Sequence, residues 1–320
     1  MSRRVLLISP CRDEAEYLAI TIESIAAQSV RPTRWVIVDD GSTDETPRIL
    51  ARAAEKYSFI QVVRREDRGK RSVGPGVIDA FYHGLSQVNL DDYDYVCKLD
   101  TDLEFKTRYF ERALEHFERD PWLGTISGKL HLRNDRGELE IERTGDENSV
   151  GPVKLFRTQC FKDIGGFVRE VCWDGIDGHM ARMNGWVACS LDEPDLEIVH
   201  LRQMGSSHVS LWHGRQRWGR GKYFMGSTPY YVAAVSLYRM LERPYVLSGV
   251  GILLGYLKAT LSDAPRMQDE RYLEFMRRFE RDSLLYGKSR TARRYHERIR
   301  REVPRPAQRA NDNLAEAFAE

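Results

Sequence analysis

The mostly apolar segment 93–99 is followed by two aspartates that are two residues apart, Asp100 and Asp102. Residues i and i+2 of an extended chain project to the same side, so both carboxylates should point at one spot. Two carboxylates at one spot repel each other unless a cation lies between them. Oxygen ligands of this kind suit Mg²⁺ or Mn²⁺, with a phosphate completing the coordination. The segment therefore predicts a strand whose carboxyl end binds a divalent metal through Asp100 and Asp102.

A second acid-tipped strand precedes this one in the chain. The segment 35–38 is apolar and ends at Asp39 and Asp40, in an Asp-Asp-Gly-Ser turn. Ligands of open α/β sheets bind beyond the carboxyl ends of the strands, so the two acidic ends can share one cleft. Asp39 or Asp40 would accept hydrogen bonds from a nucleotide base or ribose. Taken alone, these acids also suit a turn or a helix cap.

Strands and helices alternate in the first half of the chain, which predicts a parallel, doubly wound α/β sheet. The early strands are expected at 5–9, 35–38, 59–63 and 93–99, and the helices at 14–28, 44–53, 77–85 and 109–117. Later strands are expected at 125–132, 138–143, 153–156, 187–191 and 196–201, with a hairpin turn at 134–137. Helices are expected to dominate from Trp212 onward.

The 320 residues allow one large or two small domains. We expect an α/β domain at 1–210, a helical region at 211–310 and a flexible tail at 311–320. The 49 basic residues are balanced by 48 acidic ones, which gives no reason to expect a nucleic-acid partner. Five widely spaced cysteines and no visible signal peptide favour a reduced, cytoplasmic protein.

Two C-terminal features bear on membranes. Segment 271–309 holds 13 Lys and Arg against 5 Asp and Glu. This excess suits an anionic membrane surface, such as the inner face of the plasma membrane, or else a solvated helical tail. The apolar segment 244–257 is shorter than the roughly 20 residues of a spanning helix. It predicts an interfacial or buried helix whose glycines allow close packing.

A basic loop is expected after the third strand, at 68–71. Lys70 and Arg71 would contact a phosphate or a base, and Gly69 would permit close approach of the ligand. The alternative is an exposed basic loop without a ligand.

Three motifs together resemble glycosyltransferase family 2, over about residues 3–203. They are Ser-Pro-Cys-Arg-Asp-Glu at 9–14, Val-Asp-Asp-Gly-Ser-Thr-Asp at 38–44 and Leu-Asp-Thr-Asp at 99–102. The resemblance implies the GT-A fold, a mixed but mostly parallel sheet flanked by helices, and a nucleotide-sugar donor. It implies a nucleotide site lined by Pro10, Glu14, Asp39, Asp40, Asp100 and Lys70 or Arg71, with Asp100 and Asp102 on the metal and diphosphate. Cys11 and Arg12 stand where the family often has an aromatic residue and Asn.

The family also has a catalytic acid after a Gly-Gly turn, here Gly165-Gly166. Alignment on Gly185-Trp186 places that acid at Asp174, with Trp173 in place of the family's Glu. Asp174 is favoured and Asp177 stays open as the base that takes the proton of the acceptor hydroxyl. The alternative is a helix-capping aspartate without a catalytic part.

Segment 212–221 is similar to the Gln-x-x-Arg-Trp element of processive family members, although Gln216 directly precedes Arg217. Arg217 and Trp218 are candidates for contact with the acceptor or the diphosphate. His200, His208 and His213 could bind a metal or phosphate, or simply pack in the protein.

These expectations combine into one function. The protein would be a metal-dependent, inverting glycosyltransferase that uses Mn²⁺ or Mg²⁺ and a nucleoside-diphosphate sugar, with UDP-sugar favoured. The acceptor would be a saccharide or lipid-linked hydroxyl in surface polysaccharide or glycolipid synthesis, an expectation that rests on analogy. Two alternatives stay open, a sugar-phosphate nucleotidyltransferase and a catalytically inactive nucleotide-sugar-binding relative.

Overall fold

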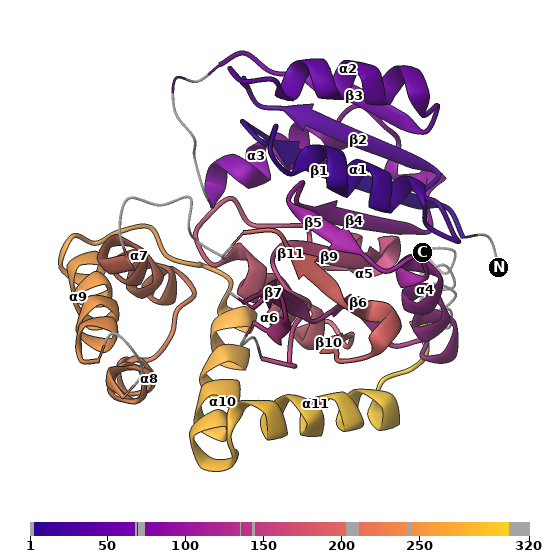
Figure 1. The fold of residues 1–320 in the computed structure, drawn as a ribbon. Coiled ribbons are helices and arrows are strands. Elements are labelled where there is room, and N and C mark those ends of the chain that lie inside the picture. The colour runs from indigo at the N-terminus through magenta and orange to yellow at the C-terminus, as the bar shows by residue number, and fades with distance from the viewer. Residues whose placement is uncertain are drawn as a thin grey trace, which may run out of the picture.

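An α/β body carries a set of C-terminal helices on one side (Figure 1). The computed structural model describes residues 3–67, 69, 74–134, 136–142, 145–202, 211–241 and 245–306. The predicted class, a mixed and mostly parallel sheet flanked by helices with a helical C-terminal extension, is confirmed. The predicted boundary at residue 210 stays a prediction.

The main sheet has seven strands in the order β10-β6-β9-β4-β1-β2-β3. Only β9 runs antiparallel to its neighbours β4 and β6. The strands β4, β1 and β2 are adjacent and parallel, so their carboxyl ends lie at one edge of the sheet. The bounds are β1 (Val5–Cys11), β2 (Arg34–Asp39), β3 (Ile60–Arg64), β4 (Tyr95–Leu99), β6 (Leu123–Gly128), β9 (Val153–Arg157) and β10 (Val187–Leu191).

A second sheet of four strands has the order β5-β11-β7-β8. Its strands are β5 (Leu103–Phe105), β7 (Leu130–Arg133), β8 (Leu139–Ile141) and β11 (Ile198–His200). The sequence did not predict β5, which is only three residues long. The single strand expected at 125–132 is in fact β6 and β7, one in each sheet. Gly128 lies at this break, where a Cβ would be 1.5 Å from the carbonyl oxygen of Leu196.

Helices cover both faces of the main sheet. Strand residues alternate between two hydrophobic clusters, so that Leu7 and Ile37 lie in one cluster while Ile8 and Val38 lie in the other. Burial on both faces explains the nearly continuous apolar runs of these strands. The helices of this part are α1 (Leu18–Ala26), α2 (Thr46–Lys56), α3 (Pro75–Leu85), α4 (Tyr109–Arg119), α5 (Thr158–Asp163) and α6 (Trp173–Met183).

Asp44 and Thr107 are the residue types expected to cap the helices that follow them, but neither does so. Glu45 occupies the N-cap of α2, while Asp44 accepts hydrogen bonds from the backbone N–H groups of Ala15 and Thr46. Arg108 rather than Thr107 occupies the N-cap of α4. At the start of α2, the Asp44 carboxylate binds the loop after β1 through the Ala15 N–H, so it does not occupy the N-cap.

The C-terminal helices form two groups (Figure 1). The helices α7 (Leu211–Phe224), α8 (Pro229–Met240) and α9 (Leu247–Leu261) pack on one another. A Cβ on Gly255 would lie 2.0 Å from the Gln216 carbonyl oxygen, so the expectation that glycines allow close packing is confirmed. No helix in the described part of the chain is long and apolar enough to cross a membrane.

The helices α10 (Glu270–Tyr286) and α11 (Lys288–Glu302) contact the α/β body instead. Arg300 pairs with Asp120, and Lys288 pairs with Glu147. Part of the basic excess at 271–309 therefore holds this segment on the protein itself.

Candidate functional site

The loops that follow β1 and β2 are built around a glycine turn. Cys11 and Asp39 pair in register at the ends of the two strands. Gly41 has φ +79°, and a Cβ there would lie 2.5 Å from the Asp67 Cα, so no other residue fits without a shift. The turn lets the Ser42 N–H donate to Asp39 Oδ1 at 2.8 Å and fixes this buried carboxylate.

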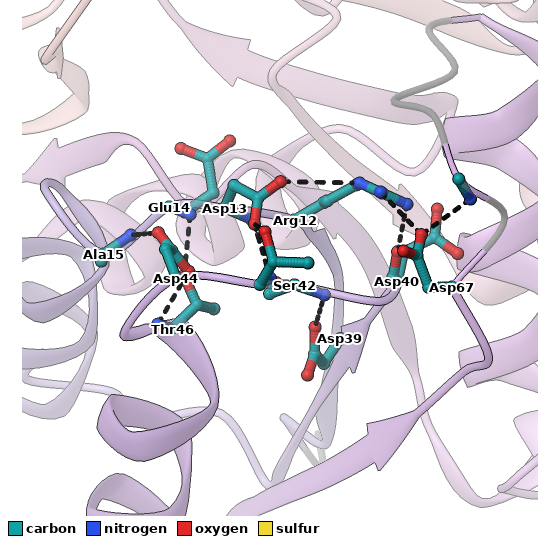
Figure 2. Close-up of polar contacts among 12 residues, drawn as sticks. Arg12, Asp13, Glu14, Ala15, Asp39, Asp40, Ser42, Asp44, Thr46 and Asp67 are labelled. Atoms are coloured by element: carbon teal, nitrogen blue, oxygen red, sulfur yellow. Dashed lines mark hydrogen bonds and ion pairs between the residues drawn. The ribbon is translucent and has the colours of Figure 1, made fainter.

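A hydrogen-bond network links the two loops (Figure 2). Asp13 accepts a hydrogen bond from the Thr43 N–H at 2.8 Å, and its own N–H donates to Ser42 Oγ. Arg12 donates to the Asp40 carbonyl oxygen and to Asp67 Oδ1, at 2.9 and 2.7 Å. Arg12, the departure from the family pattern, thus cross-links this corner of the molecule.

A pocket of about 470 Å³ lies beside this network. It is lined by Gly41, Ser42, Thr43, Arg64, Arg65, Glu66 and Asp67. Arg65 Nη1 lies 3.0 Å from Asp40 Oδ1, and Arg64 Nε lies 3.8 Å from Asp39 Oδ2. Pro10 lies opposite Val38 on the neighbouring strand. The predicted nucleotide residues Pro10, Asp39 and Asp40 are therefore together, whereas Lys70 and Arg71 lie outside the described residues.

The aspartate pair after β4 is surrounded by cations. Lys98, buried at the end of β4, donates to Asp100 Oδ1 at 2.5 Å and to the Gly151 carbonyl oxygen at 3.0 Å. Arg202 Nε lies 2.6 Å and His200 Nε2 lies 3.6 Å from Asp102 Oδ2. Burial opposes ionisation, but His200 and Arg202 lower the pKa of Asp102 below its usual value.

Arg202 joins two parts of the site that are far apart in sequence. Its Nη2 donates to Glu14 Oε1 at 2.7 Å while its Nε contacts Asp102. Glu14 is buried after β1, and β11 pairs with β5 so that His200 lies opposite Leu103. Neither Arg202 nor Lys98 was predicted. The signal for Arg202 was present, because Arg202 follows His200, the last residue of β11, at an i, i+2 spacing.

The acidic pair fits a hard cation in one respect. Asp102 Oδ1 is buried and accepts no hydrogen bond from the described residues. An unsatisfied buried carboxylate oxygen is the kind of ligand that Mg²⁺ or Mn²⁺ takes. Within the described ranges, no group of three or more His, Cys, Asp or Glu side chains forms a ready cation site. Other ligands would thus have to come from elsewhere, and phosphate oxygens are suitable.

His200 is held between two acids. Its Nδ1 is 3.3 Å from Glu142 Oε2, on the side away from Asp102. Although burial opposes its charge, Asp102 and Glu142 raise the pKa of His200 to about 9. In the metal-free protein His200 is therefore a cation beside the acidic pair.

The two candidate bases lie at the start of α6, in opposite environments. Asp177 is buried, and Lys154 Nζ lies 2.8 Å from its Oδ1 and 2.7 Å from its Oδ2. Burial raises the pKa of Asp177 to about 6. Asp174 is exposed, and its Oδ2 lies beside Gly151, 2.9 Å from where a Cβ would be. The Gly151 carbonyl oxygen also accepts a hydrogen bond from Lys98, which donates to Asp100 as well. Asp174 therefore lies close to Asp100.

The remaining predicted residues lie on α7. The centre of the Trp218 ring lies 5.7 Å from Arg215 Cζ and 5.1 Å from Arg239 Cζ. The ring also packs against the hydrophobic cluster that contains Ile252 and Tyr256. Trp218 is thus part of the α7–α9 packing. Burial lowers the pKa of Arg217, which lies within electrostatic reach of Cys172 at the head of α6. Ligand contacts by Arg217 and Trp218 stay predictions. His213 is exposed on α7, and His208 falls outside the described residues.

Comparison with known proteins gives matches in sequence. Residues 7–161 match the family model of glycosyl transferase family 2. The poly-beta-1,6-N-acetyl-D-glucosamine synthase of Staphylococcus aureus (strain COL) is 28% identical over 157 residues, which cover 48% of this chain and 35% of that protein. The Staphylococcus epidermidis synthase is 24% identical over 294 residues, 83% of this chain and 66% of that one. The chain thus spans about a third of the length of the first of these relatives.

Solved structures share the fold. GalNAc-T7 with UDP, GalNAc and Mn²⁺ superposes with a TM-score of 0.57 at 12% identity, over 89% of this chain and 58% of that one. S. aureus TarS 1–349 in complex with UDP-GlcNAc has a TM-score of 0.50 at 15% identity, over 93% and 92% of the two chains. The predicted GT-A fold is confirmed by these superpositions.

Proposed function

Since residues 7–161 belong to glycosyl transferase family 2, we propose that the protein moves a sugar from a nucleoside diphosphate to an acceptor hydroxyl. One observation carries this proposal. The neighbouring strands β4, β1 and β2 bring Asp100 and Asp102, Glu14, and Asp39 and Asp40 to a single edge of the sheet. Ligands of such sheets bind at this edge. The side chains there offer acceptors for a nucleoside and charges for a diphosphate.

The donor is a UDP-sugar. TarS and GalNAc-T7 have been solved with UDP-GlcNAc and with UDP, and the curated relatives are N-acetylglucosamine polymer synthases. The pocket beside Asp39 and Asp40 is within the size range of small-molecule sites. Asp39 Oδ1 accepts a hydrogen bond from the Ser42 N–H. The other oxygen, Oδ2, would accept a hydrogen bond from the base or the ribose.

A divalent ion, Mn²⁺ or Mg²⁺, would be held by Asp102 and Asp100 together with the donor diphosphate. When bound, it neutralises negative charge on the departing nucleoside diphosphate. Lys98, His200 and Arg202 would also stabilise the departing diphosphate, because all three cationic side chains lie within 4 Å of Asp100 or Asp102. They hold the carboxylates in place and add positive charge where the leaving group develops negative charge.

Asp174 is the base of this proposal. The Asp174 carboxylate is exposed and lies close to Asp100, whereas the Asp177 carboxylate is buried in an ion pair with Lys154. Asp174 takes the proton of the acceptor hydroxyl as that oxygen bonds to the anomeric carbon. The bond from the anomeric carbon to the diphosphate oxygen breaks, and the electron pair leaves with the nucleoside diphosphate. One such displacement inverts the configuration of the sugar.

The acceptor is a saccharide or a lipid-linked hydroxyl, and the biological setting is surface polysaccharide or glycolipid synthesis. This part of the proposal rests on the similarity to the poly-beta-1,6-N-acetyl-D-glucosamine synthases. We propose that the protein acts on the cytoplasmic side, at the membrane surface.

A thermal-shift screen of UDP-, GDP- and dTDP-sugars with Mn²⁺ tests the donor. A ligand that binds the native state raises the melting temperature by mass action. We expect UDP-sugars to do so for the wild type and not for Asp102→Asn. Asp92 is an exposed aspartate that precedes β4, the strand that Asp102 follows. Asp92→Asn is therefore the matched control and should respond as the wild type does. Release of pyrophosphate from a nucleoside triphosphate and a sugar phosphate would instead identify a nucleotidyltransferase.

A further inference from the structure

The helices α8 and α9 expose leucines to solvent. We define the docking face by six of them: Leu237, Leu241, Leu247, Leu254, Leu257 and Leu261. Their side chains are between 37% and 87% exposed. Resting on the proposed function, we propose that this face docks onto an anionic lipid bilayer and holds the enzyme at a membrane-borne acceptor.

The docking face is not a by-product of a loosely packed helix. The opposite side of α9 is buried through Ile252, Tyr256 and Ala259, and Gly255 contacts α7 closely. One half of α9 is therefore packed in protein, and the other half exposes leucines together with Lys258. Several exposed leucines on one helix mark a candidate interaction site.

The charges of the helices α7, α8 and α9 favour an anionic partner. Segment 211–261 contains one acidic residue, Glu242. Its basic residues are Arg215, Arg217, Arg220, Lys222, Arg239, Arg243 and Lys258. Lys258 is exposed directly beside Leu257. Exposed leucines interleaved with basic residues are the composition of a helix that lies in the interface of an anionic membrane.

The same charges argue against a second copy of this chain. A two-fold contact would place the docking face on itself and bring Lys258, which is exposed beside Leu257, into the contact in both copies. Acidic lipid headgroups neutralise those residues instead. Tyr238 and Tyr245, both exposed near the ends of the helices, have an apolar ring and a polar hydroxyl that suit the headgroup level. With 15 residues, α9 would lie along the bilayer surface.

The docking face is connected to the candidate base through α7. Met225, just after α7, packs against Ile176 of α6. Gly221 of α7 has no Cβ, and that space is filled by Cys172, the residue before α6. Arg220 lies 3.8 Å from Glu170. Docking would therefore hold the start of α6, and Asp174 with it, at a fixed height above the lipid.

Co-sedimentation with vesicles tests the proposal without any donor or acceptor. The vesicles contain equal parts of phosphatidylglycerol and phosphatidylcholine, with pure phosphatidylcholine vesicles alongside. We expect the wild type to bind the anionic vesicles, and Leu241→Ser/Leu261→Ser to bind at least about tenfold more weakly, since two apolar side chains no longer insert. The matched control, Leu284→Ser/Leu285→Ser, removes two exposed leucines of α10 and should bind as the wild type does. Lys258→Glu should lower binding to the anionic vesicles about tenfold or more.

Three results would overturn the proposal. The first is a wild type that stays in the supernatant, and the second is a docking-face variant that sediments as well as the wild type. The third is a concentration-dependent dimer in analytical ultracentrifugation that Leu241→Ser/Leu261→Ser abolishes. Unfolding curves of the variants show whether they fold, and all four substituted leucines are partly or largely exposed. Asp174→Asn should still bind vesicles, so a failure of the proposed transfer reaction would leave this result unchanged.

Discussion

Lys154 of β9 and Asp177 of α6 form a buried ion pair, with 2.7 Å between Lys154 Nζ and Asp177 Oδ2. Lys154 also donates to the Asp174 carbonyl oxygen at 2.7 Å. The pair therefore anchors the first turn of α6 to the sheet. Asp177 has a structural partner, while the side chain of Asp174, three residues earlier, is exposed beside the acidic corner. This division of roles can be tested with two isosteric variants.

We expect Asp177→Asn to lose about 3–5 kcal/mol of unfolding free energy, because it leaves the Lys154 ammonium buried without its counter-charge. We expect Asp174→Asn to stay within about 0.5 kcal/mol of the wild type and to lose about 10²–10⁴-fold in transfer rate. Urea unfolding and a transfer assay with a UDP-sugar measure the two quantities. The assignment is wrong if Asp174→Asn transfers sugar at the wild-type rate.

Arg202→Met should destabilise the metal-free protein, because it leaves the carboxylates of Glu14 and Asp102 close together in a buried site. The loss should be about 2–3 kcal/mol of unfolding free energy, the range for hydrogen bonds to charged groups. Arg202→Lys, which keeps the charge and loses the fork of donors, should lie between the two. Urea unfolding in the presence of EDTA measures this. Equal stability of all three proteins would show that Arg202 does not bridge the acids.

Stability should fall as the pH drops below the ordinary pKa of histidine, partly because of His296. Burial lowers the pKa of His296 to about 2, and its Nε2 accepts a hydrogen bond from Arg182. The unfolded chain takes up a proton at His296 below about pH 6.5, while the folded protein does not. The free energy of unfolding therefore falls by about 1.4 kcal/mol for each pH unit below that value. His296→Gln keeps an acceptor and removes the titrating group. Between about pH 7.5 and about pH 5.5, the wild type should lose about 1.4 kcal/mol more than this variant. Parallel pH profiles would contradict the assignment.

The packing of α7 on α9 should depend on single glycines. A Cβ on Gly255 would meet the backbone of Gln216, so Gly255→Ala must push the two helices apart. We expect a cost of about 1–3 kcal/mol from overpacking. Gly214→Ala on the same helix pair meets no atom within 4 Å and should be neutral or stabilising by up to about 1 kcal/mol. Thermal unfolding of both variants measures the difference, and equal melting temperatures would show that α7 and α9 are not in close contact.

The sequence predicted the parts of this fold that local pattern controls. The strands β1, β2 and β4 are mostly apolar and are followed by polar turns, so their positions and their acidic ends were foreseeable. The break between β6 and β7 was not, because it arises where Gly128 meets the backbone of Leu196, almost seventy residues away. The three-residue strand β5 exists because β11 pairs with it, and no local period marks so short a strand.

In the candidate site, the acids were predictable and their partners were not. Asp39, Asp100 and Asp102 follow strands directly, whereas Arg202 reaches Asp102 only because β11 lies beside β5 in the second sheet. Likewise, Asp174 and Asp177 could not be separated by spacing. The difference between them is Lys154, which arrives from an antiparallel strand inserted in the parallel sheet.

The central claim is that Asp100 and Asp102 bind the donor diphosphate through a divalent ion. Isothermal titration of UDP into the protein with Mn²⁺, and again with EDTA, tests it most directly. We predict binding with Mn²⁺ that weakens by about a hundredfold or more, about 2.7 kcal/mol, both in EDTA and in Asp102→Asn. Equal affinity for UDP with and without the metal, or in Asp102→Asn and the wild type, would contradict the account.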